Sequence, residues 1–195
     1  MTVRFTRAEL EAFQGATVDD LLGPDVRLLF VGINPGLWTA AVNAHFARRG
    51  NRFWPALYRA GITSTQVDAS GGMPADARAE LVAKGVGITN LVPVATARAD
   101  ELTAEQLRDG GARLRQRVAE LRPAVVAMLG LTAFREAFGV RKAPLGRSDD
   151  TFEGAELWLL PNPSGLNAHH TVESLADWYG RAAIAAGVID VNSRG

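Results

Sequence analysis

Short apolar runs alternate along this chain with longer stretches in which apolar residues recur at helical spacing. Four runs, at residues 26–31, 86–92, 124–129 and 156–160, have the length of strands. The run at 124–129 is apolar without alternation, which is typical of a strand covered on both faces. The stretches between them predict helices at 6–14, 51–60, 74–83, 103–121, 130–138 and 171–186.

This order of elements predicts the fold class. Strands that alternate with helices at these lengths form a parallel sheet with helices on both faces. We therefore expect an α/β protein, a three-layer α/β/α sandwich around a central, mainly parallel sheet of four to five strands. Neither a repeat nor a linker divides the chain, so residues 1–195 are expected to form one domain. The stretch at 141–154 is polar and is predicted to be a flexible loop.

Composition narrows the class of protein without giving a function. A hydrophobic fraction of 47% and a charged fraction of 22% are those of a soluble globular protein. The charged N-terminus lacks the apolar core of a signal peptide, no run reaches the length of a membrane span, and cysteine is absent. We expect a cytoplasmic monomer with no membrane partner. The three histidines predict no metal site, and no cofactor is expected.

Two proline-containing turns carry asparagines directly after predicted strands. The first is Gly32-Ile33-Asn34-Pro35-Gly36, after the run at 26–31, and the second is Asn162-Pro163-Ser164-Gly165-Leu166-Asn167, after the run at 156–160. Asn-Pro-Gly alone is a common turn sequence. Since the carboxyl ends of parallel strands share one edge of the sheet, where ligands bind in open α/β folds, the two turns together predict a site for a small molecule or a water.

These motifs carry a resemblance to a known family. The two turns, with the segment Asn51-Arg52-Phe53-Trp54 between them, resemble the signature motifs of the mismatch-specific uracil- and thymine-DNA glycosylase branch of the uracil-DNA glycosylase superfamily. The similarity extends from about residue 22 to residue 181 and includes the strand at 87–92. It implies a monofunctional enzyme that binds double-stranded DNA containing a mismatched or damaged pyrimidine, notably G·U. Such an enzyme flips the base out and hydrolyses its N-glycosidic bond, leaving an abasic site for base excision repair.

The resemblance also implies roles for individual residues. Asn34 would position the attacking water, backbone groups of Ile33 would line the pocket, Phe46 would stack on the base, and Asn162 would lie near it. Gly165, Leu166 and Asn167 would form a wedge loop, with Leu166 filling the gap that the flipped nucleotide leaves. Phe46 as a core aromatic and Leu166 as a contact under the following helix are the structural alternatives.

The residue types limit the chemistry. Asn34 is a neutral carboxamide that can orient water but cannot act as a general base. The most efficient family members have an acidic residue in the first motif and a histidine opening the second, where this chain has Asn34 and Asn162. Slow turnover is therefore expected. Asp100, in the loop that leaves the same sheet edge, is a candidate substitute for the missing carboxylate, and a solvent-exposed local cap is its alternative role.

Basic residues near the two motifs are candidates for DNA contacts. With 21 basic and 21 acidic side chains, any affinity for DNA must come from a local patch. Arg48, Arg49 and Arg52 cluster beside the first motif, and His169 and His170 follow the second. Such charges are often simply solvated. Two other functions are alternatives: a nucleotide-dependent enzyme, for which the phosphate-loop glycine pattern is missing, and a catalytically weak sensor of DNA lesions.

Overall fold

The computed structural model describes residues 4–165, 167 and 169–191. Its strands are β1 (Leu28–Gly32), β2 (Val86–Asn90), β3 (Val125–Leu129), β4 (Gly146–Phe152) and β5 (Ala155–Leu160). The helices are α1 (Arg7–Glu11), α2 (Leu37–Ala41), α3 (Phe53–Arg59), α4 (Ala75–Ala83), α5 (Ala104–Leu121), α6 (Leu131–Phe138) and α7 (Val172–Ala185), with a 3₁₀ turn, η1 (Ala99–Glu101).

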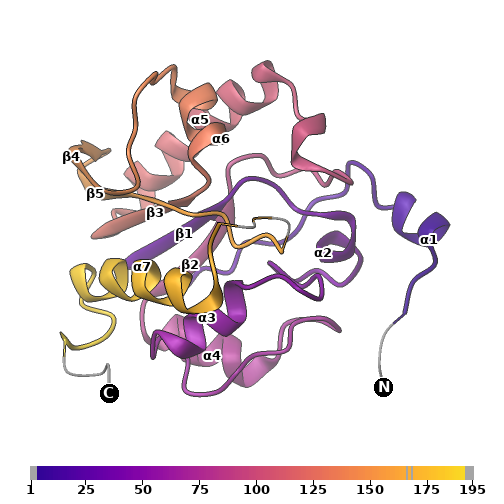
Figure 1. The fold of residues 1–195 in the computed structure, drawn as a ribbon, viewed down its shortest axis with the longest axis horizontal. Coiled ribbons are helices and arrows are strands. Elements are labelled where there is room, and N and C mark those ends of the chain that lie inside the picture. The colour runs from indigo at the N-terminus through magenta and orange to yellow at the C-terminus, as the bar shows by residue number, and fades with distance from the viewer. Residues whose placement is uncertain (1–3, 166, 168, 192–195) are drawn as a thin grey trace.

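The five strands form one twisted sheet in the order β2-β1-β3-β5-β4. The first four strands are parallel, and β4 pairs antiparallel with β5 at the edge. Helices α3, α4 and α7 lie on one side of this sheet, and α5 and α6 on the other (Figure 1). The predicted α/β/α sandwich around a mainly parallel sheet is confirmed.

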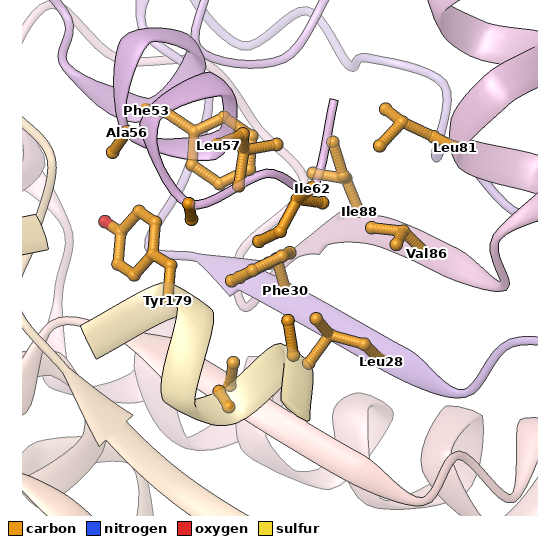
Figure 2. Close-up of a cluster of buried hydrophobic side chains, with 14 of the residues drawn as sticks. Leu28, Phe30, Phe53, Ala56, Leu57, Ile62, Leu81, Val86, Ile88 and Tyr179 are labelled. Atoms are coloured by element: carbon orange, nitrogen blue, oxygen red, sulfur yellow. The ribbon is translucent and has the colours of Figure 1, made fainter. Parts of the chain in front are cut away.

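Successive residues of the central strands feed two separate cores, as the pleat of a strand requires. Leu28 and Phe30 of β1 belong to a core shared with α3, α4 and α7, where the Phe30 ring meets Phe53 edge-on (Figure 2). Leu29 and Val31 belong to the second core, under α5 and α6. Both faces of β1 and β3 are therefore covered, which explains why their sequences show no alternation of apolar and polar residues.

The helix starts follow local sequence rules. Thr6 caps α1 and Thr103 caps α5, each in a reciprocal capping box with the residue three positions later. Thr171, predicted as a cap, accepts a hydrogen bond from the backbone N–H of Ser174 at the start of α7. These caps fix where the connecting loops end.

One strand and one α-helix were not predicted, and the strand predicted at 86–92 is shorter. The expected loop at 141–154 contains β4, whose side chains are mostly exposed and polar because it is an edge strand, so it shows no apolar run. The five-residue helix α2 follows Gly36 directly. The strand predicted at 86–92 ends at Asn90, and the next two backbone N–H groups bond to the carbonyls of Gly32 and Ile33.

The topology creates a crevice between β1 and β3. The chain leaving β1 leads to the layer of α3 and α4, whereas the chain leaving β3 enters α6 in the opposite layer. Where neighbouring parallel strands send their connections to opposite faces, the loops separate and leave a cleft at the carboxyl edge. Both asparagine turns lie at this edge.

Candidate active site

A cavity of about 160 Å³ lies at the carboxyl edge of the sheet. It is bounded by the turn after β1, the end of β2, the loop at 96–99, the end of β3 and the turn after β5. Four of the predicted site residues line it: Ile33, Asn34, Phe46 and Asn162. The expectation that the two turns face one site is therefore met by the geometry.

The carboxamide of Asn34 is held in one orientation. Its Nδ2 donates to the carbonyl oxygen of Val94 at 3.1 Å and to Oγ1 of Thr96 at 2.7 Å. A carbonyl oxygen can only accept, so the NH₂ group must face Val94. The Thr96 hydroxyl in turn donates to the carbonyl of Arg98 at 2.7 Å, which leaves its lone pair for Asn34. Among the described residues nothing donates to Asn34 Oδ1, so this oxygen is the acceptor that Asn34 can offer to a ligand.

Phe46 forms an aromatic wall of the cavity. Its ring stacks on that of Phe53, with centroids 4.0 Å apart and planes 25° apart. Its backbone has a φ of +54°, a conformation that is uncommon for a bulky residue and is often found at functional sites. Gly32 makes room for the ring, because a Cβ on Gly32 would lie 3.1 Å from Phe46 Cζ. The position suits stacking against a flat ligand.

The cavity lining contains a second carboxamide, that of Asn90, which is held by His45. His45 Nε2 lies 3.0 Å from the carbonyl oxygen of Asp19, so this nitrogen carries the proton, and Nδ1 accepts from Asn90 Nδ2 at 3.3 Å. Burial lowers the pKa of His45 to about 4, and the ring is therefore neutral at neutral pH. Asn90 keeps its Oδ1 and its second N–H for a ligand.

The second turn fixes Asn162 in a similar way. Asn162 Oδ1 accepts a hydrogen bond from the backbone N–H of Ser164 at 2.9 Å, an Asx turn that leaves the NH₂ group as the donor available to a ligand. The turn is anchored below by Tyr179, whose hydroxyl donates to the carbonyl of Pro161 at 3.1 Å. Burial raises the pKa of the Tyr179 phenol, which stays protonated and able to donate. The backbone carbonyl of Ile33 is occupied, since it accepts from Val92 N–H.

The predicted DNA-contact residues have different surroundings. The Arg52 guanidinium donates to the carbonyls of Gly165 at 3.0 Å and Asn167 at 2.7 Å, and also to the carbonyl of His170. It thereby holds the second loop, although sequence reasoning gave it a contact with DNA. His169 is exposed, and Leu166 lies outside the described residues.

Asp100 is not among the residues that line the cavity. It lies on η1 with its side chain 62% exposed, and its carboxylate pairs with Arg98. Arg98 and Ala99 do line the cavity, so Asp100 is near the rim in sequence, but the turn directs it into solvent. This is the placement expected of the alternative, structural role.

Sequence reasoning missed Thr96, His45 and Asn90 as site residues. Asn90 carried a pattern that was available: it is a third asparagine at the carboxyl end of a strand, like Asn34 and Asn162. The contributions of His45 and Thr96 are hydrogen bonds across long sequence separations, which no local pattern encodes. A larger surface groove of about 820 Å³ between α5 and α6 contains none of the predicted site residues.

Comparison with known proteins places this geometry in a family. The family model for the Uracil DNA glycosylase superfamily matches residues 20–184, which include all the residues that line the 160 Å³ cavity. The chain belongs to the uracil DNA glycosylase superfamily. Members of this superfamily are DNA glycosylases, which supports that class of activity for this chain.

A solved structure supports the same fold at low sequence identity. The chain is similar to the solution NMR structure of "a putative Uracil DNA glycosylase" from Methanosarcina acetivorans, with a TM-score of 0.59 and 14% identity. The match covers 89% of this chain and 98% of that one. At this identity the likeness concerns the fold, and the superfamily assignment rests on the family match.

The described residues contain neither a candidate metal-binding group nor a helix that could span a membrane. His, Asp and Glu side chains nowhere gather in the groups of three or more that would hold a metal ion, within the described part of the chain. In the same part, none of the helices is long and apolar enough to cross a membrane.

Proposed function

We propose that this protein is a monofunctional DNA glycosylase that removes uracil from mismatched duplex DNA, notably from G·U pairs. The observation that carries the proposal is a cavity lined both by the Asn34 carboxamide, which is held with its oxygen available, and by the aromatic ring of Phe46. The match to the uracil DNA glycosylase superfamily supports the reaction class. Thymine and damaged pyrimidines are proposed as further substrates.

The proposed reaction is a hydrolysis. The bond between sugar C1′ and base N1 breaks with its electron pair leaving on the base, and a water oxygen forms the new bond to C1′. Asn34 Oδ1 would accept a hydrogen bond from that water and fix its position. A carboxamide does not take up the proton, which passes to solvent or to the departing base. None of the described residues that line the cavity is Asp or Glu, so the positive charge in the transition state is weakly stabilised, and slow turnover follows.

The polar groups of the cavity suit the edge of uracil. Uracil presents an N3–H donor between two carbonyl acceptors, and a carboxamide can pair with N3–H and one carbonyl at the same time. Asn90, held by His45 through one N–H, has its oxygen and its other N–H left for that pairing. Asn162 offers an NH₂ donor that can stabilise negative charge on the leaving base. Phe46 would stack on the ring.

The preference for mismatches is proposed on the sequence motifs and on the cost of flipping. The first turn and the Asn162–Asn167 motif resemble those of the mismatch-specific branch. Extruding a base costs a few kcal/mol, less for a mispair, and an enzyme with weak transition-state stabilisation depends on this saving more than an efficient one does.

The test is cleavage of duplex DNA that contains a single uracil, followed by alkali to break the chain at the abasic site. Duplexes of otherwise identical sequence with a G·U, A·U or G·T pair, and the uracil-containing single strand, measure the substrate preference. We expect cleavage of G·U first. Retained binding without cleavage under excess enzyme would instead identify a lesion sensor. The absence of both binding and cleavage would overturn the proposal.

We also propose Asp100 as a catalytic aid, because its loop leaves the same sheet edge and contributes Arg98 and Ala99 to the cavity lining. The Asp100→Asn variant tests it. Loss of base release with the fold intact would support the role, whereas an unchanged single-turnover rate would remove it.

A further inference from the structure

The three arginines beside the first motif have different surroundings. Arg52 is turned inward and bonds to carbonyls of the second loop. Arg48 and Arg49 are exposed, and among the described residues neither side chain has a hydrogen-bond or ion-pair partner. Asp68 lies near enough to Arg49 to feel its charge, but its carboxylate is engaged chiefly by Ser70. Two guanidinium groups are therefore available to a ligand.

These two arginines line a second cavity of about 240 Å³. The other lining residues are Gly50, Asn51, Ser164 and Gly165. Arg48, Asn51 and Ser164 also line the base-sized cavity, so the two hollows adjoin at the point where both motif loops meet. The loops touch closely there, because a Cβ on Gly165 would lie 2.7 Å from the carbonyl oxygen of Gly50.

We propose that this second cavity binds a phosphodiester group of the DNA backbone next to the flipped nucleotide, with Arg48 and Arg49 as its cationic ligands. The inference rests on the proposed function, because it is the flipped nucleotide in the first cavity that brings the backbone to the second. A guanidinium matches the geometry of phosphate oxygens through paired N–H donors. The lining contains no aromatic side chain, which suits a charged backbone group better than a second base.

The proposed role is to hold the backbone in its rotated position. Extruding a base swings the nucleotide about its flanking phosphates, and a cationic site beside the pocket favours the extruded state over the stacked one. The chain has no net charge, so a small number of such contacts must supply its electrostatic attraction to DNA. Arg48 lines both cavities and therefore lies at the junction of the base site and the backbone site.

The first test is the salt dependence of binding. The ligand is a G·U duplex whose uridine carries a 2′-fluorine, so that it binds without being cleaved. The slope of log K against log salt is negative, and each lost phosphate contact should make it less steep by about 0.9. We expect the double variant Arg48→Ala/Arg49→Ala to show this loss, Arg48→Lys to keep the slope, and the control Arg141→Ala, an exposed arginine outside both cavities, to match the wild type.

The decisive test replaces the phosphates flanking the uridine one at a time with neutral methylphosphonates. In the wild type, one replacement should weaken binding about tenfold, and the same replacement should have little effect in the double variant Arg48→Ala/Arg49→Ala. An equal loss in both proteins overturns the proposal. If the wild type shows this arginine-dependent effect but never cleaves G·U DNA, the glycosylase function fails and the phosphate site stands. If it cleaves and no phosphate depends on the arginines, the site alone fails.

Discussion

Asparagine at three strand ends defines the chemistry of this site at the scale of single residues. Each carboxamide has one end committed to the protein: Asn34 and Asn90 through NH₂, and Asn162 through its oxygen. An amide that is free to rotate by 180° exchanges donor and acceptor at little cost, so these partners decide what each residue offers a ligand. Two of the three asparagines were predictable from turn sequences, but their orientations depend on distant partners.

Thr96 should matter through Asn34. Removing its hydroxyl in Thr96→Val takes away an acceptor for Asn34 Nδ2, which costs about 1 kcal/mol of positioning energy and about fivefold in rate. Single-turnover cleavage of a G·U duplex measures the effect. Thr96→Ser, which keeps the hydroxyl, should retain the rate. A retained rate in Thr96→Val together with a loss in Thr96→Ser would show that the methyl packing matters and the hydrogen bond does not.

His45 should make folding stability depend on pH. Burial lowers its pKa from 6.5 to about 4, so between these values the unfolded chain binds a proton that the folded chain does not. Stability should therefore be complete above pH 6.5 and fall as pH decreases toward 4, by about 3 kcal/mol from this group. Asp19 and Arg78 are the charged groups that act on the ring.

Urea unfolding at several pH values measures that component. The variant His45→Gln has no titrating ring, so the difference in unfolding free energy between it and the wild type should change across pH 4 to 6.5. A constant difference over this range would mean that the ring is charged or solvated in the folded protein.

At the scale of elements, secondary structure was predictable where burial leaves a pattern in the sequence: an unbroken apolar run in a strand covered on both faces, or apolar residues at helical spacing in a helix covered on one. The strands under two helix layers gave apolar runs, and α5 gave a periodic pattern with a capping threonine. Strand β4 could not be predicted, because an edge strand with exposed polar side chains has the composition of a loop. The short helix α2 depends on the turn that precedes it.

The Arg52 contacts predict a structural role that differs from DNA binding. Arg52→Ala should lower the free energy of unfolding by about 1–3 kcal/mol, because three carbonyls of the second loop lose their donor. It should leave the salt slope of DNA binding unchanged. Arg52→Lys should recover little, since an ammonium lacks the flat fork that spans separate carbonyls. A slope reduced by about one, with stability intact, would restore the original assignment to a phosphate contact.

Close packing of α5 gives a test of the scaffold. A Cβ on Gly110 would lie 2.4 Å from the carbonyl oxygen of Leu91, which is backbone and cannot move aside. Gly110→Ala gains about 1 kcal/mol of helix propensity but incurs an overpacking cost of about 1–3 kcal/mol. We expect a lower Tm by thermal unfolding. Ala112→Gly, at an exposed position of the same helix, calibrates the propensity effect, and a raised Tm for Gly110→Ala would show that the helix shifts freely.

At the scale of the whole molecule, the site follows from the order of the strands. Because β1 and β3 are neighbours and send their loops to opposite layers, three strand ends carrying asparagine converge on one crevice. The alternation of elements predicted this edge, but the strand order, and with it the adjacency of Asn90 to His45, required the structure. The basic cluster beside the first motif was visible in the sequence, but the structure was needed to separate Arg48 and Arg49, which line a cavity, from Arg52, which bonds to the second loop.

The central claim is that Asn34 positions the water that cleaves the N-glycosidic bond of a flipped uracil. Its most direct test is single-turnover cleavage of a duplex with one G·U pair by the wild type and by Asn34→Ala, with Gln116→Ala, an exposed change on α5, as the control. We expect cleavage by the wild type and the control, and a rate at least about 100-fold lower for Asn34→Ala with binding and fold retained. Equal rates for all three proteins would contradict it.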